Sequence, residues 1–216
     1  MNAAIAWTAA LLLLVQDPPK PAPFEKEIEA FEALDRTSPP PENGIVAVGS
    51  SSVRLWKSAE GLPDLRIINR GFGGSQIADS VRYAERIILP YKPRVVVVYA
   101  GGNDINAKKT PEQVADDFKA LVAKIHGALP KTKVYFISIN PNVARKSQDA
   151  RCRKLNALIE EFTKTDPRLG YIDTAGPMRA EDGGPRPELL RPDGLHLNDD
   201  GYKIWNDVVG AVLRKS

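Results

Sequence analysis

The run Val95-Val96-Val97-Val98-Tyr99 constrains the fold of this chain more than any other sequence feature. β-Branched and aromatic residues favour strands, and an uninterrupted apolar run leaves no polar face for water. Such a strand belongs in the middle of a parallel sheet whose two faces are both covered by helices. Shorter apolar runs alternate with helix-like segments along the rest of the chain, as that architecture requires.

This alternation predicts the positions of the main elements. Strands are expected at 45–49, 65–69, 94–100, 133–139 and 171–173. Helices are expected at 24–34, 76–89, 110–129, 150–163 and 201–213, the last with Asn198 as its N-cap. The predicted fold class is α/β, a three-layer α/β/α sandwich built on a five-stranded parallel sheet. A chain of 216 residues is long enough for one such domain with a well-buried core.

The N-terminal segment differs from the rest. Residues 3–15 form an apolar run broken only by Thr8, which is too short to span a bilayer but suits the core of a signal peptide. We therefore expect a signal peptide at 1–16, a Pro-rich linker at 17–23 and a single domain at 24–216. The protein would then be extracytoplasmic (periplasmic or secreted), with no stable membrane span after processing. No Lys or Arg precedes the run, so an uncleaved anchor or a misassigned start, with a cytoplasmic protein, is the alternative.

Composition disfavours several classes of function. Lys and Arg number 30 and Asp and Glu 27, and the basic residues are scattered, so nucleic acid is not an expected partner. The single cysteine, Cys152, allows neither an internal disulfide nor a cysteine-based zinc site. The two histidines, His126 and His196, cannot build a His-rich metal centre, and we expect His126 to be structural. No cofactor is indicated, and the oligomeric state is left open.

Chemically useful residues follow the predicted strands. Ser51 follows the first strand, Gly74 the second and Asn103 the third, while Asp193 and His196 follow the fifth. In open α/β sheets, ligands bind at the carboxyl ends of the strands, so these residues are expected on one rim. A serine on a tight strand-to-helix turn can be a nucleophile. Serine is also a favoured helix N-cap, and the stretch around Ser51 alone favours that simpler role.

Together these residues supply the parts for acyl transfer to water. Ser51 would be the nucleophile, His196 the base that takes its proton, and Asp193 the carboxylate that orients the base. The backbone N–H groups of Ser51 and Gly74 and the side-chain amide of Asn103 would form an oxyanion hole.

At this point the chain resembles the SGNH (GDSL-type) hydrolases, from about residue 45 to its end. The matching blocks, in the order of the family, are Gly-Ser-Ser-Ser at 49–52, Asn-Arg-Gly-Phe-Gly-Gly-Ser at 69–75, Gly-Gly-Asn-Asp at 101–104 and Asp-Gly-Leu-His at 193–196. The resemblance implies a flavodoxin-like α/β/α fold and a metal-free esterase or acylhydrolase. Ser50 stands where the family usually has Asp, which leaves the register of the three serines open, although the spacing from Gly49 favours Ser51.

The expected substrate is an ester of a small or carbohydrate alcohol with a short acyl group, such as an O-acetyl sugar. The loops at 71–75, 140–153 and 174–192 are polar and offer little surface to line an apolar groove. Two alternatives stay open: a lysophospholipase-like lipid-ester acylhydrolase, and a catalytically dead carbohydrate-binding module on the same fold. A metal-dependent phosphoesterase, suggested by the Asn103-Asp104 turn, would need a richer cluster of ligands.

Overall fold

The structure, a computed structural model, describes residues 22–216. The predicted signal peptide at 1–16 and residues 17–21 of the predicted linker lie outside the described residues. Within the described part of the chain, no helix combines the length and the apolar character needed to cross a bilayer.

Five parallel strands form one sheet in the order β2-β1-β3-β4-β5. They are β1 (Ile45–Gly49), β2 (Ile67–Gly71), β3 (Val95–Tyr99), β4 (Lys133–Ile137) and β5 (Leu169–Ile172). The central strands β1 and β3 are buried along their whole length, as expected for strands covered on both faces. This confirms the predicted five-stranded parallel sheet and the central place of the run that begins at Val95.

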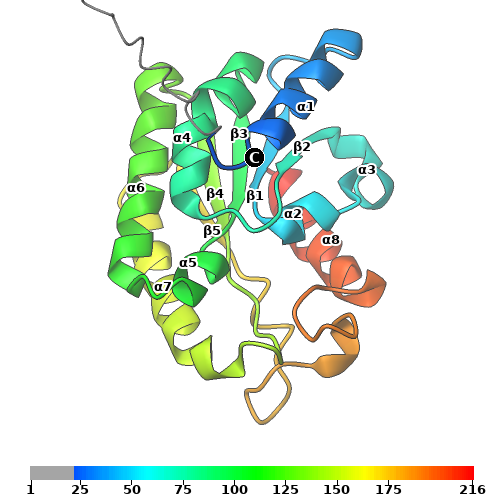
Figure 1. The fold of residues 1–216 in the computed structure, drawn as a ribbon, viewed down its shortest axis with the longest axis vertical. Coiled ribbons are helices and arrows are strands. Elements are labelled where there is room, and N and C mark those ends of the chain that lie inside the picture. The colour runs from blue at the N-terminus through cyan, green and yellow to red at the C-terminus, as the bar shows by residue number, and fades with distance from the viewer. Residues whose placement is uncertain (1–21) are drawn as a thin grey trace, which may run out of the picture.

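Helices cover both faces of the sheet, which confirms the three-layer arrangement (Figure 1). One layer contains α4 (Ile77–Ile87), α6 (Pro111–Ala128) and α7 (Asp149–Thr163), with α1 (Glu25–Thr37) packed against α4. The other contains α8 (Asp199–Leu213) and the short helices α2 (Ser51–Leu55) and α3 (Ser58–Gly61). The short α5 (Gly102–Asn106) follows β3 at the rim. Asn198 caps α8 as predicted, because its side-chain oxygen accepts from the backbone N–H of Gly201 at 3.0 Å.

The second strand lies two residues later than its predicted position at 65–69. A 3-10 turn at Pro63–Leu65 and a left-handed Arg66, with a φ of 47°, delay its start until Ile67. The strand then continues to Gly71, which pairs with Gly49 at the end of β1. The strands β1 and β2, which precede the first two loops of the site, therefore end at the same position along the sheet.

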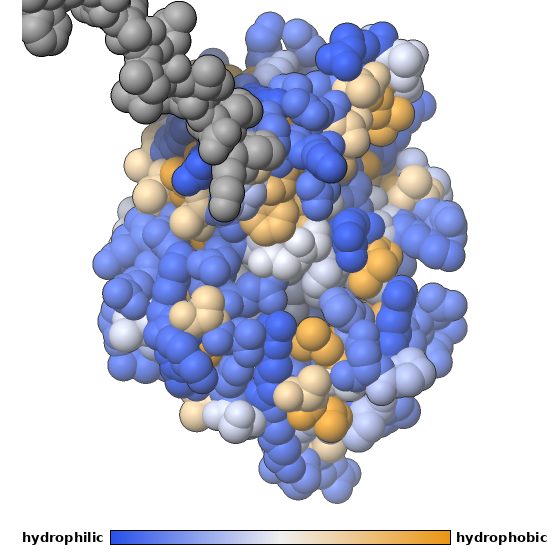
Figure 2. Space-filling model, viewed as in Figure 1, coloured by the Kyte–Doolittle hydropathy of each residue, from blue (hydrophilic) through white to orange (hydrophobic). Residues whose placement is uncertain are grey.

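The switch point of the sheet lies between β1 and β3, because the chain leaves β1 towards β2 and later returns to add β3 on the other side. Such switch points are where open α/β sheets bind ligands. Hydrophilic residues dominate the face of the molecule shown in Figure 2, and its apolar patches are small and separated.

Candidate active site

Ser51 is the first residue of α2, directly after a sharp turn at the end of β1. Gly49 has a φ of 148°, and a Cβ there would lie 2.0 Å from the carbonyl oxygen of Tyr99, so only glycine fits. The backbone N–H of Ser50 donates to that same carbonyl at 3.1 Å. The Ser50 side chain makes no capping hydrogen bond to the turn. The close approach of β1 and β3 at this turn thus fixes the start of α2, whose first residue is Ser51.

The structure brings Ser51, His196 and Asp193 together. The Nε2 atom of His196 lies 2.8 Å from Ser51 Oγ, and its Nδ1 atom lies 2.7 Å from Asp193 Oδ2. The other carboxylate oxygen of Asp193 accepts from the backbone N–H groups of Leu195 and His196, each at 2.9 Å. Of the three consecutive serines, Ser51 is the one whose hydroxyl contacts the imidazole.

The Asp193 carboxylate is ionised at neutral and mildly acidic pH. The hydrogen bond from the His196 imidazole, helped by the backbone N–H groups of His196 and Leu195, lowers the pKa of Asp193 to about 2. An ionised carboxylate at Nδ1 holds the proton on that nitrogen and leaves Nε2 free to accept one from Ser51.

Three hydrogen-bond donors, each after a different strand, belong to residues that line one hollow: Ser51, Gly74 and Asn103. Within residues 22–216, the backbone N–H groups of Ser51 and Gly74 donate to no backbone or side-chain acceptor. Gly74 has a φ of 84°, a left-handed conformation that favours glycine. The Nδ2 atom of Asn103 donates one hydrogen to the carbonyl of Ser75 at 3.0 Å, which leaves its second hydrogen for a ligand. All five residues predicted for the site therefore lie on one rim.

Arg145 is a site residue that the sequence analysis did not identify. Its Nη1 atom donates to Asn103 Oδ1 at 3.0 Å and to the carbonyl of Gly102 at 3.2 Å. The loop that carries it is fixed to the Asp-His loop, because the Gly194 carbonyl accepts from Val143 at 2.9 Å and from Ala144 at 3.0 Å. A guanidinium 42 residues away in sequence thus orients the Asn103 amide, a contact that no local pattern indicates.

Two hollows meet at Ser51 and His196. The inner hollow, of about 40 Å³, is floored by Tyr99, Ile139 and Cys152. Burial raises the pKa of Tyr99 to about 12 and that of Cys152 to about 11, so this floor is uncharged near neutral pH. The outer hollow, of about 300 Å³, is larger and more open, and its lining consists of Ser51, Arg54, Gly73, Gly74, Asn103, Arg145, Leu195 and His196.

An aromatic cluster beneath the site holds α2 and α8 together. The Trp205 ring, fully buried, meets Tyr99, Trp56 and Tyr202 edge to face at centroid distances of 4.9, 5.5 and 5.6 Å. The Tyr202 hydroxyl also donates to the carbonyl of Ser52 at 2.7 Å. Because α8 begins just after His196 and α2 begins with Ser51, this packing fixes the distance between the two side chains.

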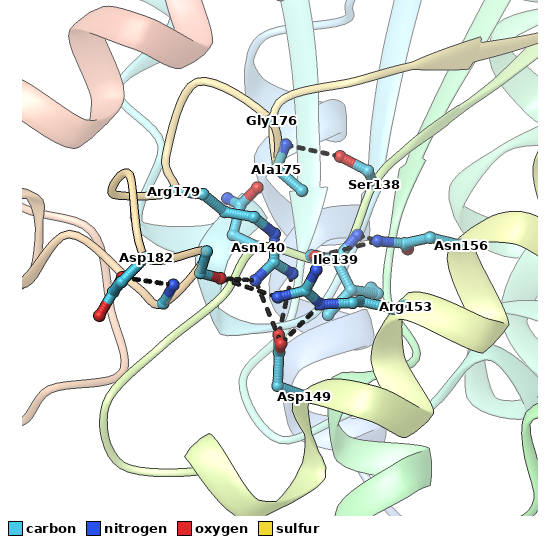
Figure 3. A network of polar contacts seen from close by, with 12 residues as sticks. Ser138, Ile139, Asn140, Asp149, Arg153, Asn156, Ala175, Gly176, Arg179 and Asp182 are labelled. Carbon is cyan, nitrogen blue, oxygen red and sulfur yellow. Dashed lines mark hydrogen bonds and ion pairs between the residues drawn. The ribbon is translucent and has the colours of Figure 1, made fainter.

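The long segment between β5 and the Asp-His loop is tied down by a second network (Figure 3). Arg179 donates to both carboxylate oxygens of Asp149 at 2.9 and 3.1 Å, and Arg153 donates to the same carboxylate at 2.8 Å. Both guanidinium groups also donate to the carbonyl of Gly183 at 2.8 Å. Although burial opposes it, hydrogen bonding to the two arginines lowers the pKa of Asp149. The network anchors this segment to the start of α7.

Asp104, which raised the possibility of a metal site, has a structural environment. Its carboxylate is fully buried, accepts from the backbone N–H of Ile77 at 3.3 Å and pairs with Lys109 at 3.1 Å. It thus ties α5 to the start of α4. Across residues 22–216, no group of three or more His, Cys, Asp or Glu side chains is placed to hold a metal ion. His126 contacts the Thr132 carbonyl through Nε2 at 3.0 Å, far in sequence from the rim residues.

Comparisons with known proteins agree with this geometry. The model of the GDSL-like lipase/acylhydrolase family matches residues 49–204, a range that contains every site residue described above. The chain is 28% identical over 171 residues to platelet-activating factor acetylhydrolase IB subunit alpha1 of Bos taurus, covering 74% of this chain and 71% of that protein. It is 24% identical over 164 residues to the isoamyl acetate-hydrolyzing esterase of Schizosaccharomyces pombe, covering 69% of this chain and 63% of that protein. The crystal structure of a GDSL-like lipase from Bacteroides thetaiotaomicron has the same fold, with a TM-score of 0.75 at 21% identity, covering 87% of this chain and 97% of that one.

Proposed function

The chain belongs to the GDSL-like lipase/acylhydrolase family of ester-hydrolysing enzymes, and we propose that it removes short acyl groups, acetyl above all, from polar alcohols through an acyl-enzyme on Ser51. One observation carries this proposal. The hydrogen-bonded series from Asp193 through His196 to Ser51 ends at the mouth of a hollow of only about 40 Å³.

In the first half of the proposed reaction, Ser51 Oγ attacks the ester carbonyl while His196 Nε2 takes the serine proton. The carbonyl oxygen becomes an oxyanion, which accepts from the N–H groups of Ser51 and Gly74 and from the free hydrogen of Asn103. Each donor of this kind typically lowers the barrier by about 2.7–4 kcal/mol. Collapse of the tetrahedral intermediate breaks the ester C–O bond, and His196 gives its proton to the departing alcohol.

The second half repeats these steps with water. His196 takes a proton from the water as it attacks the acyl-enzyme, and returns it to Ser51 Oγ as the acid leaves. Asp193 keeps the imidazole in the required orientation and compensates its charge in both halves. The scheme routes no step through a metal ion or a cofactor.

The inner hollow supports the preference for short acyl groups. A cavity that holds one water has a volume of roughly 10–15 Å³ by the same measure, so about 40 Å³ accommodates a group of a few heavy atoms. Its floor of Tyr99, Ile139 and Cys152 is buried and packed against the core. A longer chain directed at this floor would meet these buried side chains, and overpacking against them typically costs about 1–3 kcal/mol. Two relatives are named for acetyl hydrolysis, namely the acetylhydrolase subunit and the isoamyl acetate esterase.

The outer hollow supports a polar alcohol. Its lining includes two guanidinium groups, an amide and glycine backbone, which can donate hydrogen bonds to the hydroxyl groups of an alcohol. A hydroxyl-rich alcohol such as a sugar fits this lining best.

The test is kcat/KM across acetyl, butyryl, octanoyl and palmitoyl esters of one alcohol. We expect acetyl to exceed butyryl by about tenfold and octanoyl by more than about a hundredfold, in line with the cost of overpacking. A rise towards octanoyl or palmitoyl would replace the proposal with a lipid-ester acylhydrolase. An inactive protein would favour a binding module, whereas activity that survives Ser51→Ala would refute the mechanism through Ser51.

A matched pair of variants connects the preference to the inner hollow. Ile139→Val removes one methylene from its floor, whereas Ile137→Val removes the same group from a buried position nearby that does not line it. Both substitutions should lower the free energy of unfolding by a similar amount, about 0.5–1.5 kcal/mol. Only Ile139→Val should raise the ratio of butyryl to acetyl turnover.

A further inference from the structure

We propose that the outer hollow binds a negatively charged group, a carboxylate or a phosphate, carried by the alcohol part of the ester. The inference rests on the proposed function, because it assumes that the acyl group enters the inner hollow and the alcohol lies in the outer one. Two arginines, Arg54 from α2 and Arg145 from the loop after β4, carry the argument.

The Arg54 side chain lies against Gly73, in the glycine-rich loop after β2, and lines the same hollow as Ser51. Its guanidinium lies so close to Gly73 that a Cβ there would be 2.7 Å from Arg54 Cζ. The next residue, Gly74, supplies one of the proposed oxyanion donors. The side chain is exposed, and among the described residues it forms neither a hydrogen bond nor an ion pair. All of its donors are therefore free for a ligand that occupies the outer hollow.

Arg145 lines this hollow beside Asn103, and it also lines the inner hollow. It is half-buried, and within residues 22–216 its side chain donates to two neutral acceptors, the Gly102 carbonyl and Asn103 Oδ1. These contacts fix the position of the guanidinium without neutralising its charge, and they involve only the Nη1 atom. Its Nη2 and Nε donors remain available.

No carboxylate offsets these two charges at the hollow. Among the described residues that line it, none is Asp or Glu. The nearest acid of the site, Asp193, turns both carboxylate oxygens towards the Asp-His loop, where they bind His196 and Leu195. Two guanidinium groups in one concave, partly enclosed site concentrate positive potential there.

The chemistry of the guanidinium defines the ligand. Its planar set of N–H donors matches the oxygen atoms of a carboxylate or a phosphate, and charge-assisted hydrogen bonds of this kind are about twice as strong as neutral ones. Both anions fit the same pair of arginines. The inferred substrates are thus acetyl esters of acidic sugars or of phosphorylated polyols.

The test uses two matched pairs of acetyl esters with the purified protein. The carboxylate pair is the monoacetate of methyl glucuronoside as the free acid and as its neutral amide. The phosphate pair is the monoacetate of glycerol 3-phosphate and that of glycerol. We expect kcat/KM to be about tenfold higher or more for at least one anionic ester than for its neutral partner at low salt. This ratio should shrink in 0.5 M NaCl.

Variants of Arg54 assign the effect to the hollow. Arg54→Gln should bring the ratio close to one, and Arg54→Lys should keep part of it. Arg36→Gln, which changes an exposed arginine in α1 that lines neither hollow, should leave the ratio unchanged.

The outcomes separate the two proposals. If the neutral acetates are hydrolysed through Ser51 but neither anionic ester is preferred, or if the preference survives Arg54→Gln, the anion site is refuted and the proposed function stands. If no acetate of either pair is hydrolysed, or if hydrolysis continues in Ser51→Ala, the proposed function itself fails.

Discussion

Replacing Asn103 by alanine separates transition-state stabilisation from substrate binding. In the structure, one Nδ2 hydrogen of Asn103 is bound to the Ser75 carbonyl and its Oδ1 atom accepts from Arg145. In the proposed mechanism, the remaining hydrogen is donated to the charge that develops only as the carbonyl becomes tetrahedral. Its loss should therefore lower kcat more than it raises KM.

The substitution should lower kcat greatly and the free energy of unfolding only moderately, so the experiment separates a catalytic role from a structural one. Loss of one oxyanion donor corresponds to about 10²–10³ in kcat. Loss of the two hydrogen bonds lowers the free energy of unfolding by about 2 kcal/mol, which is a decrease of about 4–8 °C in Tm for a chain of this size. At 25 °C the Asn103→Ala protein should therefore be folded and slow.

Two further variants control for structural damage. Asn103→Asp keeps an acceptor for Arg145 but removes the donor and adds a negative charge, so its kcat should fall at least as far as that of Asn103→Ala. Asn106→Ala removes a hydrogen bond of 2.9 Å to Gln148 from the same helix, α5, and should leave kcat within about twofold. The assay is steady-state hydrolysis of an acetyl ester together with a thermal melt. An unchanged kcat with a raised KM would show that Asn103 only binds substrate.

Three other predictions concern the same site. A fluorophosphonate probe should label Ser51, and Ser51→Ala should abolish labelling and activity while Ser50→Ala and Ser52→Ala keep most of both; peptide mapping of the adduct to either neighbour would refute the assignment. Activity should survive dialysis against a strong chelator, because no cluster of metal ligands is found in residues 22–216. A loss of activity that zinc or manganese restores would overturn the mechanism. The pKa of Asp193 is lowered to about 2 in the folded protein, so its pairing stabilises the fold above about pH 4 and that stability is lost as the pH falls towards 2. The Tm difference between the wild type and Asp193→Asn should accordingly shrink over that interval, and an equal difference at pH 2 and pH 6 would contradict it.

Much of the fold could be predicted because its signals are local. The apolar run at Val95, the capping residues Thr110 and Asn198, and the proline that opens α6 each determine a boundary through nearby contacts. The start of β2 could not be predicted in this way. Leu65 has the composition of a strand residue, but it belongs to a 3-10 turn followed by the left-handed Arg66.

The site residues also divide into those that sequence signals predict and those that depend on tertiary contacts. Ser51, Gly74 and Asn103 could be proposed because each follows closely after a strand, and the ends of parallel strands share an edge. Asp193 and His196 lie well beyond the end of β5, and their spacing of three residues is what indicates them. The contribution of Arg145 depends on how the loop after β4 folds back over Gly102, which is a tertiary contact without a sequence pattern. Arg54 lies in a helix pattern, and only the geometry of Gly73 shows where its guanidinium is held.

The wide separation of the site residues along the chain also makes enzymatic activity a probe of folding order. Ser51 and His196 are 145 residues apart, and the three proposed oxyanion donors follow β1, β2 and β3. No fragment that has formed only its local helices can hold these groups together. Parallel pairings between distant segments form late, because the entropy of closing long loops must be overcome first. In a refolding experiment, recovery of esterase activity should therefore lag behind the far-ultraviolet signal of the helices and coincide with completion of the sheet and docking of α8.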